Sequence, residues 1–303
     1  MLSQMMLRNW IYHLPPPIIK LARRMKHMVP SGPVVHTLAS WRKVCQSALQ
    51  VIGGTVGTIE GSQCSIAWPT TGSGSPSMTA SLRVNPSSDL DVFCQVWTDQ
   101  HYRAVVKYMR KWVAPTDPLR IIDAGANVGF TTLYLKAHFP NAHIISVEPE
   151  ASNFAQMTHN VTSNQLDNVT LLQAGLWKSQ AFLEVGRDWA DQREWSFYVK
   201  EAPAPTTLLG YDVQAILRQA AWQSVDLLKM DIEGAERYLF ADDHTAAQTL
   251  RNVRFLAIEI HDGEDLRARI YSQLRKHGFD FFDSGELTIA RNAAMMPPLQ
   301  SAN

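Results

Sequence analysis

Acidic and imidazole side chains end two neighbouring apolar segments of this sequence. Asp231 and Glu233 follow one apolar run, and Glu259 and His261 close the next. Residues two apart on a strand point to the same side, so Glu259 and His261 face together. Carboxylates and imidazoles gathered at one edge of a sheet can orient a polar substrate or accept its proton. The sequence therefore predicts a polar reaction site at these two strand ends.

Asp231 is the leading catalytic candidate, with Glu233 and His261 beside it. His261 would be the better proton acceptor near neutral pH, because an unperturbed imidazole titrates there. Each residue also has a structural interpretation, since strand-end acids fix turns and lone histidines pack. Glu236 is expected to begin a helix and to stabilise its first turn. A divalent ion at these carboxylates is a further alternative, but the spacing matches no known metal signature, so no metal is expected.

A glycine turn between a short apolar strand and a helix lies earlier in the chain. Gly125 can adopt positive φ, and Gly129 removes a side chain where a ligand or the strand must approach the opening helix. Unpaired N–H groups at a helix N-terminus attract anionic or zwitterionic ligands. The turn is therefore a candidate ligand site, with a plain tight turn as the alternative. Its Gly-x-Asn-x-Gly spacing departs from the Gly-x-Gly-x-x-Gly of dinucleotide dehydrogenases.

Glu148 ends a second apolar strand, shortly after the glycine turn. Ligands of open α/β sheets bind beyond the carboxyl ends of the strands, so Glu148 should face the same crevice as the turn. A carboxylate there can accept both hydroxyls of a ribose, although it could also be a solvated acid. Ribose occurs in both NAD and S-adenosylmethionine, and only the spacing of the turn favours the second.

Several motifs occur together between residues 82 and 292, including the segments 88–97 and 257–261. The most specific are Asp123-Ala-Gly-Ala-Asn-Val-Gly129, Val147-Glu-Pro149, Asn160 and Asn164, and Leu228-Lys-Met-Asp-Ile-Glu-Gly-Ala-Glu236. Together they resemble the FkbM family of S-adenosylmethionine-dependent methyltransferases. The first eighty residues carry no motif of this family.

The resemblance implies an S-adenosylmethionine site and transfer of its sulfonium methyl group to a nucleophile. Such a reaction needs mainly alignment of donor and acceptor and exclusion of water. Asp123 would lie under the glycine turn near the methionine part of the donor. Glu148 would bind the ribose, and a loop at Ala174 would border the adenine. The residues that would wrap the donor are Gly125, Ala126, Asn127 and Gly129.

Methylation of a hydroxyl on a small molecule, sugar or glycan is the expected activity, because a hydroxyl acceptor needs a nearby base. The sequence has no Asn-Pro-Pro-Tyr or Asp-Pro-Pro-Tyr segment, which slightly favours oxygen over base nitrogen. Two alternatives stay open: a nicotinamide-dependent oxidoreductase, disfavoured by the turn spacing, and a methyltransferase-like binding module without catalysis. Trp177, Trp189 and Trp195 could cover an acceptor or pack in an aromatic core.

Composition agrees with an enzyme of this kind. The 303 residues, of which 46% are hydrophobic, suffice for one large α/β core plus an extension. A formal net charge of zero gives no general attraction to nucleic acid. Three separated cysteines without a Cys-x-x-Cys pair indicate neither a zinc site nor a disulfide framework, and they favour a reducing, cytoplasmic location. No apolar run reaches the length of a membrane span.

Residues 1–80 are expected to form a basic extension of a methyltransferase domain at residues 81–303. Seven Lys or Arg residues precede the first acid, Glu60. Residues 18–28 place apolar and basic side chains at helical spacing, which predicts an amphipathic helix. This helix could lie on an anionic membrane surface, pack on the catalytic domain or belong to a transit peptide. The sequence does not indicate an oligomeric state.

These residues must be positioned by a sheet. From residue 119 onward, apolar strand patterns alternate with helical ones, as in a parallel sheet with crossover helices. This predicts a Rossmann-like, mostly parallel α/β sheet flanked by helices. Asp262 should cap a helix at 264–277. The other predicted elements are a helix after Pro149 with Phe154, Met157 and Val161 on one face, a helix near 211–222, strands 168–176, 224–231 and 254–261, and hairpins 181–185 with 195–199 and 279–283 with 287–291.

Overall fold

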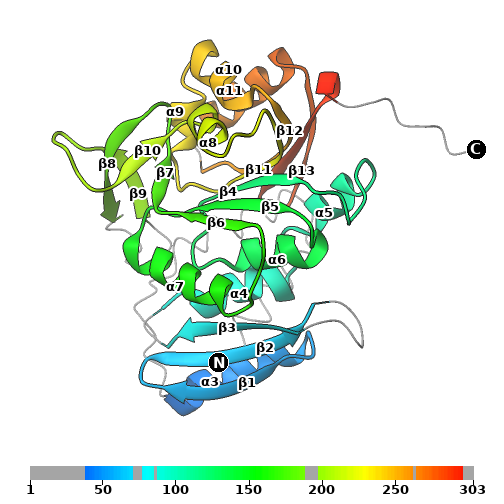
Figure 1. The fold of residues 1–303 in the computed structure, drawn as a ribbon, viewed down its shortest axis with the longest axis vertical. Coiled ribbons are helices and arrows are strands. Elements are labelled where there is room, and N and C mark those ends of the chain that lie inside the picture. The colour runs from blue at the N-terminus through cyan, green and yellow to red at the C-terminus, as the bar shows by residue number, and fades with distance from the viewer. Residues whose placement is uncertain (1–37, 71–76, 85–86, 188–196, 262–263, 296–303) are drawn as a thin grey trace, which may run out of the picture. The chain divides into compact units, whose positions relative to one another are not determined.

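The computed structural model describes residues 38–70, 77–84, 87–187, 197–261 and 264–295. Its central sheet contains β4 (Arg120–Ala124), β5 (His143–Val147), β6 (Val169–Leu172), β11 (Val225–Met230), β12 (Val253–Glu259), β13 (Phe279–Ser284) and β14 (Leu287–Asn292). The strand order is β13-β14-β12-β11-β4-β5-β6 (Figure 1). The five strands from β12 to β6 are parallel, and β14 is antiparallel to both of its neighbours. The predicted Rossmann-like fold is confirmed.

Helices cover both faces of this sheet because its strands are apolar on both sides. Ile121 and Ile122 of β4 are both fully buried, but they belong to the two different apolar cores. The first core includes residues of α5 (Arg103–Met109) and α6 (Phe130–His138). The second includes residues of α8 (Val213–Gln219), α10 (Asp243–Leu250) and α11 (Glu264–Lys276).

A smaller antiparallel sheet precedes the central one. It has the order β1-β2-β3 and is followed by two short helices. The elements are α3 (Leu38–Gln50), β1 (Thr55–Glu60), β2 (Gln63–Pro69), β3 (Ser77–Arg83), α4 (Asp89–Phe93) and the π-helix η1 (Cys94–Thr98). Phe93 packs edge-on against Trp68 of β2 and Phe130 of α6, so this sheet shares the first apolar core. The predicted domain boundary between residues 80 and 81 falls within β3.

Side-chain amides of α7 (Ala151–Thr162) and of the turn after it bind the outer edge of β3. The N–H of Ser81 donates to Asn160 Oδ1 at 2.8 Å, and its carbonyl accepts from Gln156 Nε2 at 2.7 Å. The N–H of Thr79 donates to Asn164 Oδ1 at 2.9 Å, and its carbonyl accepts from Asn164 Nδ2 at 2.7 Å. These amides therefore satisfy the β3 edge as a further strand would.

An inserted sheet separates β6 from β11. It consists of β7 (Ala174–Leu176), β8 (Ala181–Arg187), β9 (Phe197–Glu201) and β10 (Leu209–Tyr211), in the order β7-β10-β8-β9. The prediction of one strand at 168–176 was wrong, because β6 pairs with β5 whereas β7 pairs with β10. The helix predicted near 211–222 is also shorter, since Tyr211 ends β10 and the Asp212 side chain caps α8. Trp177 is 2% exposed, which supports its packing interpretation.

The remaining predicted elements agree with the structure to within a few residues. The hairpins β8–β9 and β13–β14 both form, and Met157 and Val161 of α7 are buried. The three cysteines are free and buried. The predicted cap at Asp262, the helix at 18–28, Trp189 and Trp195 lie outside the described residues. Within the described ranges, no helix is both long and apolar enough to cross a membrane.

Candidate active site

The glycine turn after β4 has the backbone that its sequence predicts. Gly125 and Gly129 have φ values of +73° and +89°, and Asn127 also has a positive φ of +50°. A Cβ atom on Gly125 would lie 1.7 Å from the backbone oxygen of Asp231. On Gly129 it would lie 3.1 Å from Cγ of Met157 in α7. The missing side chain of Gly129 thus makes room for α7, whereas the sequence suggested that a ligand or the strand would approach at this position.

A buried lysine holds this turn from the neighbouring strand. Lys229 of β11 donates through Nζ to the carbonyls of Gly125 at 2.7 Å and Ala124 at 3.2 Å. It also forms an ion pair with Asp123 Oδ1 at 3.1 Å, and Asp123 Oδ2 accepts from Thr132 Oγ1 at 2.8 Å. Although burial opposes the charge, the Asp123 carboxylate raises the pKa of Lys229. Asp123 therefore lies under the turn, with Oδ2 hydrogen-bonded to Thr132 and Oδ1 facing Lys229 in an ion pair without a hydrogen bond.

Glu148 closes the turn from the end of β5. Its Oε2 accepts the N–H of Asn127 at 2.8 Å, and its Oε1 accepts the N–H of Glu150 at 3.0 Å. Glu148 is 5% exposed, and burial raises its pKa to about 7, although both N–H groups favour the charged form. Glu148 therefore contacts the glycine turn, and the expectation that the two face one ligand crevice stays a prediction.

Two features of the turn leave polar groups available to a ligand. Asn127 Oδ1 is buried and has no hydrogen-bond partner among the described residues. The first residue before α6 is Gly129, so no side chain caps this helix, and its first turn contains no acid. A helix N-terminus carries a partial positive charge that favours a carboxylate. Together with Glu148, these groups suit a ligand that carries both a carboxylate and a ribose.

The predicted catalytic residues meet beyond the ends of β11 and β12. His261 Nε2 lies 3.6 Å from Asp231 Oδ1 and 3.6 Å from Glu233 Oε2. Glu233 has a φ of +52°, an uncommon conformation for a residue with a side chain. All three side chains are partly exposed, by 26% for Asp231, 38% for Glu233 and 27% for His261. They can therefore contact a substrate.

Glu236 orients His261, a role that the sequence did not indicate. It begins α9 (Glu236–Leu239), as predicted, but its side chain is fully buried. Glu236 Oε1 lies 3.1 Å from His261 Nδ1 and accepts the N–H of Ile232 at 3.3 Å. This contact points His261 Nε2 towards Asp231 and Glu233.

The charges of this cluster change the expected role of His261. Burial by itself lowers the pKa of His261. The hydrogen bond to Glu236 and the charge of Asp231 outweigh burial and raise this pKa to about 11. Burial and the charge of Asp231 raise the pKa of Glu233 to about 8. His261 is thus a cation at neutral pH and not the proton acceptor expected from the sequence. The carboxylates become the candidates for that role.

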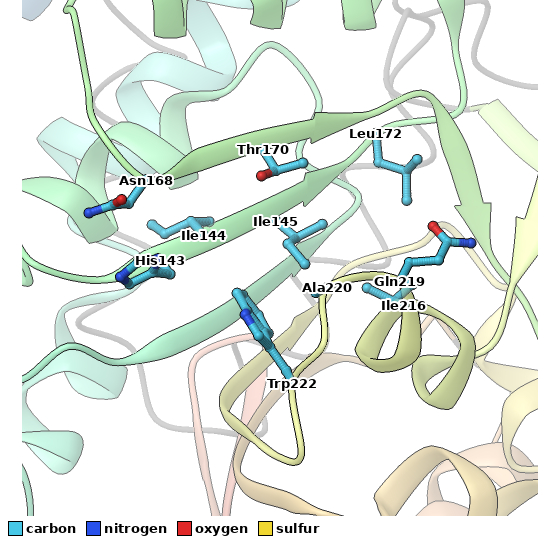
Figure 2. A pocket seen from close by; sticks show the side chains of 10 residues that line it. All are labelled: His143, Ile144, Ile145, Asn168, Thr170, Leu172, Ile216, Gln219, Ala220 and Trp222. Atoms are coloured by element: carbon cyan, nitrogen blue, oxygen red, sulfur yellow. The ribbon is translucent and has the colours of Figure 1, made fainter.

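Ala174 and the residues that line one surface groove do not belong to this cluster. Ala174 is fully buried in β7, opposite Leu209 of β10, and not in a loop as predicted, so its contact with an adenine stays a prediction. A groove of about 410 Å³ runs between β5, β6 and α8, where His143 and Trp222 line it (Figure 2). None of the predicted site residues lines this groove.

Gly125→Ala is expected to destabilise the chain more than Gly278→Ala. Both glycines have similar φ values, +73° and +76°, so both variants incur about 1–3 kcal/mol of backbone strain. Only Gly125 would also place its Cβ against a backbone atom, whereas Gly278 has no heavy atom within 4 Å. Denaturant unfolding of the two variants measures the difference. Equal destabilisation would show that the turn can move away from Asp231.

The chain resembles known proteins in sequence and in structure. The family described as methyltransferase FkbM domain matches residues 123–281, just over half of the chain. Methyltransferase sdnD of Sordaria araneosa is 28% identical over 199 residues, covering 55% of this chain and 75% of that protein. Methyltransferase 1 of Beauveria bassiana (strain ARSEF 2860) is 27% identical over 191 residues, covering 52% of this chain and 69% of that protein. A solved METTL16 MTase domain (crystal form 2) is 12% identical, with a TM-score of 0.43, and the match covers 70% and 83% of the two chains.

Proposed function

Because this chain belongs to the FkbM methyltransferase family, we propose that it transfers a methyl group from S-adenosylmethionine to a hydroxyl oxygen of a small molecule, sugar or glycan. The observation that carries this proposal is the contact between the glycine turn and Asp231. The N–H of Asp231 donates to the carbonyl of Ala124 at 3.1 Å, and the backbone oxygen of Asp231 lies against Gly125. A candidate base is thus fixed directly beside the candidate donor site.

The turn and Glu148 form the donor half of the site. When bound, S-adenosylmethionine supplies a methyl group already activated on a sulfonium. Asn127 and the N-terminus of α6 would bind the amino-acid end, and Glu148 would accept the ribose hydroxyls. Lys229 fixes the two turn carbonyls and so restricts the positions that a donor can take. This preorganisation supplies the alignment that methyl transfer requires.

The carboxylates beyond β11 and β12 form the acceptor half. Asp231 would orient the acceptor hydroxyl and take its proton as the oxygen attacks. Glu233, whose Oε2 lies 3.6 Å from His261 Nε2, is the second candidate for this role. His261, held by Glu236, fixes the spacing of these two carboxylates. A hydroxyl acceptor must lose a proton, and these groups could accept it. They therefore support an enzyme that methylates a hydroxyl more than a methyltransferase-like binding module without catalysis.

S-adenosylmethionine and S-adenosylhomocysteine are expected to stabilise the chain against thermal unfolding, and NAD is not. Ligand at ~100 times its dissociation constant should add about 2.7 kcal/mol. A thermal-shift assay with the three compounds at equal concentration measures this. Stabilisation by NAD alone would contradict the proposed function.

Affinity for S-adenosylhomocysteine is expected to rise between about pH 6 and pH 8. Burial raises the pKa of Glu148 to about 7, and only the ionised carboxylate can accept both ribose hydroxyls. Glu148→Gln should bind more weakly and lose this part of the pH dependence. Isothermal titration calorimetry of both chains measures it, and any slope that remains in Glu148→Gln belongs to the ligand or to other groups that titrate in this range, such as Glu233. Identical pH profiles would remove Glu148 from the donor site.

A further inference from the structure

We propose that His101, Glu259 and Glu286 form a binding site for one divalent first-row cation, with Mn²⁺ preferred over Mg²⁺. His101 lies between η1 and α5, Glu259 is the last residue of β12, and Glu286 lies in the turn between β13 and β14. Each offers one ligand atom, and these atoms all lie within 4.8 Å of one another. Three distant parts of the chain thus converge on one point.

The side chain of His101 indicates that a partner is missing. It is only 8% exposed, and its Nε2 is buried without a hydrogen-bond partner among the described residues. This nitrogen points at Glu259 Oε2 from 3.6 Å, which is longer than a hydrogen bond. Tyr102, itself 3% exposed, packs edge-on against the ring with centroids 4.9 Å apart and fixes its direction. A buried nitrogen held in this way is expected to have a ligand.

Distances and charge both fit a cation. Ligand atoms at about 2.0–2.2 Å from one ion lie roughly 3–4.4 Å from each other. His101 Nε2 and Glu259 Oε2, 3.6 Å apart, could therefore bind one ion without moving. Glu286 follows Gly285 in a two-residue turn and can close the remaining distance by rotating its side chain. Although burial opposes the charge, Glu259 raises the pKa of His101, so the cation must displace a proton from this ring. Two carboxylates and the neutral imidazole then balance a divalent charge. The imidazole disfavours Mg²⁺, which prefers an all-oxygen octahedron.

A neighbouring group consists of Asp231, Glu233 and His261, whose ligand atoms are also within 4.8 Å of one another. There, however, the imidazole already contacts Glu236 through one nitrogen and faces two carboxylates with the other. Glu259 lies between the groups, with Oε1 3.9 Å from His261 Nε2. The cation would therefore lie beside the acceptor half of the site. Its binding does not depend on the proposed reaction.

The test is a titration of the full, metal-free chain with Mn²⁺ alone, in which electron paramagnetic resonance counts the free ion. We expect about one Mn²⁺ per chain, displaced by Mg²⁺ only in large excess. His101→Ala and Glu286→Gln should each weaken binding by at least ~10-fold. His143→Ala, at an exposed histidine at the start of β5, and Glu233→Gln should bind like the unaltered chain.

Three results would overturn the proposal. The first is that the unaltered chain does not bind Mn²⁺. The second is that neither His101→Ala nor Glu286→Gln weakens Mn²⁺ binding. The third is that Glu233→Gln weakens Mn²⁺ binding whereas Glu286→Gln does not. Thermal melting of each metal-free variant shows whether it folds. Glu286 lies in a partly exposed turn, so Glu286→Gln decides the matter even if His101→Ala does not fold.

Discussion

Asp231→Asn is expected to lower turnover by ~100-fold or more while leaving the fold and most of the donor affinity intact. Asparagine has the same shape as aspartate but cannot take a proton from a hydroxyl. The Asp231 side chain is 26% exposed, so no buried ion is lost in the exchange. The backbone of Asp231, which supports the glycine turn, does not change.

The measurement is release of S-adenosylhomocysteine with a hydroxylated compound that the unaltered chain methylates, chosen from a screening panel. Asp280→Asn is the matched control, because its carboxylate forms an exposed ion pair with Arg291 on β14, outside the predicted site residues. Normal turnover of Asp231→Asn would transfer the role of base to Glu233.

Lys229→Met is expected to lower the free energy of unfolding by about 3–5 kcal/mol. The Asp123 carboxylate would stay fully buried without its cation, and the carbonyls of Ala124 and Gly125 would lose their donor. Because the Gly125 carbonyl is part of the turn, donor binding should fall as well. Denaturant unfolding and calorimetry with S-adenosylhomocysteine measure the two effects.

A double variant separates the buried charge from the loss of packing. Adding Asp123→Asn to Lys229→Met removes the unpaired carboxylate, while Thr132 can still donate to the amide oxygen. Much of the lost stability should return, because deleting both members of a buried ion pair costs far less than deleting one. A single variant within about 1 kcal/mol of the unaltered chain would show that Lys229 is dispensable for this turn.

The sequence predicts those parts of the site that depend on short-range patterns. Gly125 and Gly129 are needed for positive φ, and a strand that ends in Glu148 must deliver it to the carboxyl edge of the sheet. The same rule brought Asp231 and His261 together. Such patterns were sufficient for the central sheet because each strand and each turn is encoded within about ten residues.

Pairs of residues from distant segments could not be predicted in this way. Glu236 and His261 are 25 residues apart, and no local pattern distinguishes an acid that begins a helix from one that also orients an imidazole. His101 is a lone histidine in a polar loop, and Glu286 appears only as a turn residue. The split between β6 and β7 was missed because both read as one apolar run, although they pair in different sheets.

The pairing of β3 with α7 has a consequence for synthesis of the chain. The N–H of Ser81 can form its hydrogen bond only once Asn160 has been synthesised, 79 residues later. At a ribosomal rate of about 5–20 residues per second, the edge of β3 stays unpaired for roughly 4 to 16 s before the side-chain amides of α7 have been synthesised. Asn160 also donates through Nδ2 to the carbonyl of Val128 in the glycine turn. The candidate donor site is therefore complete only after an interval in which the unpaired edge of β3 is available to other nascent proteins.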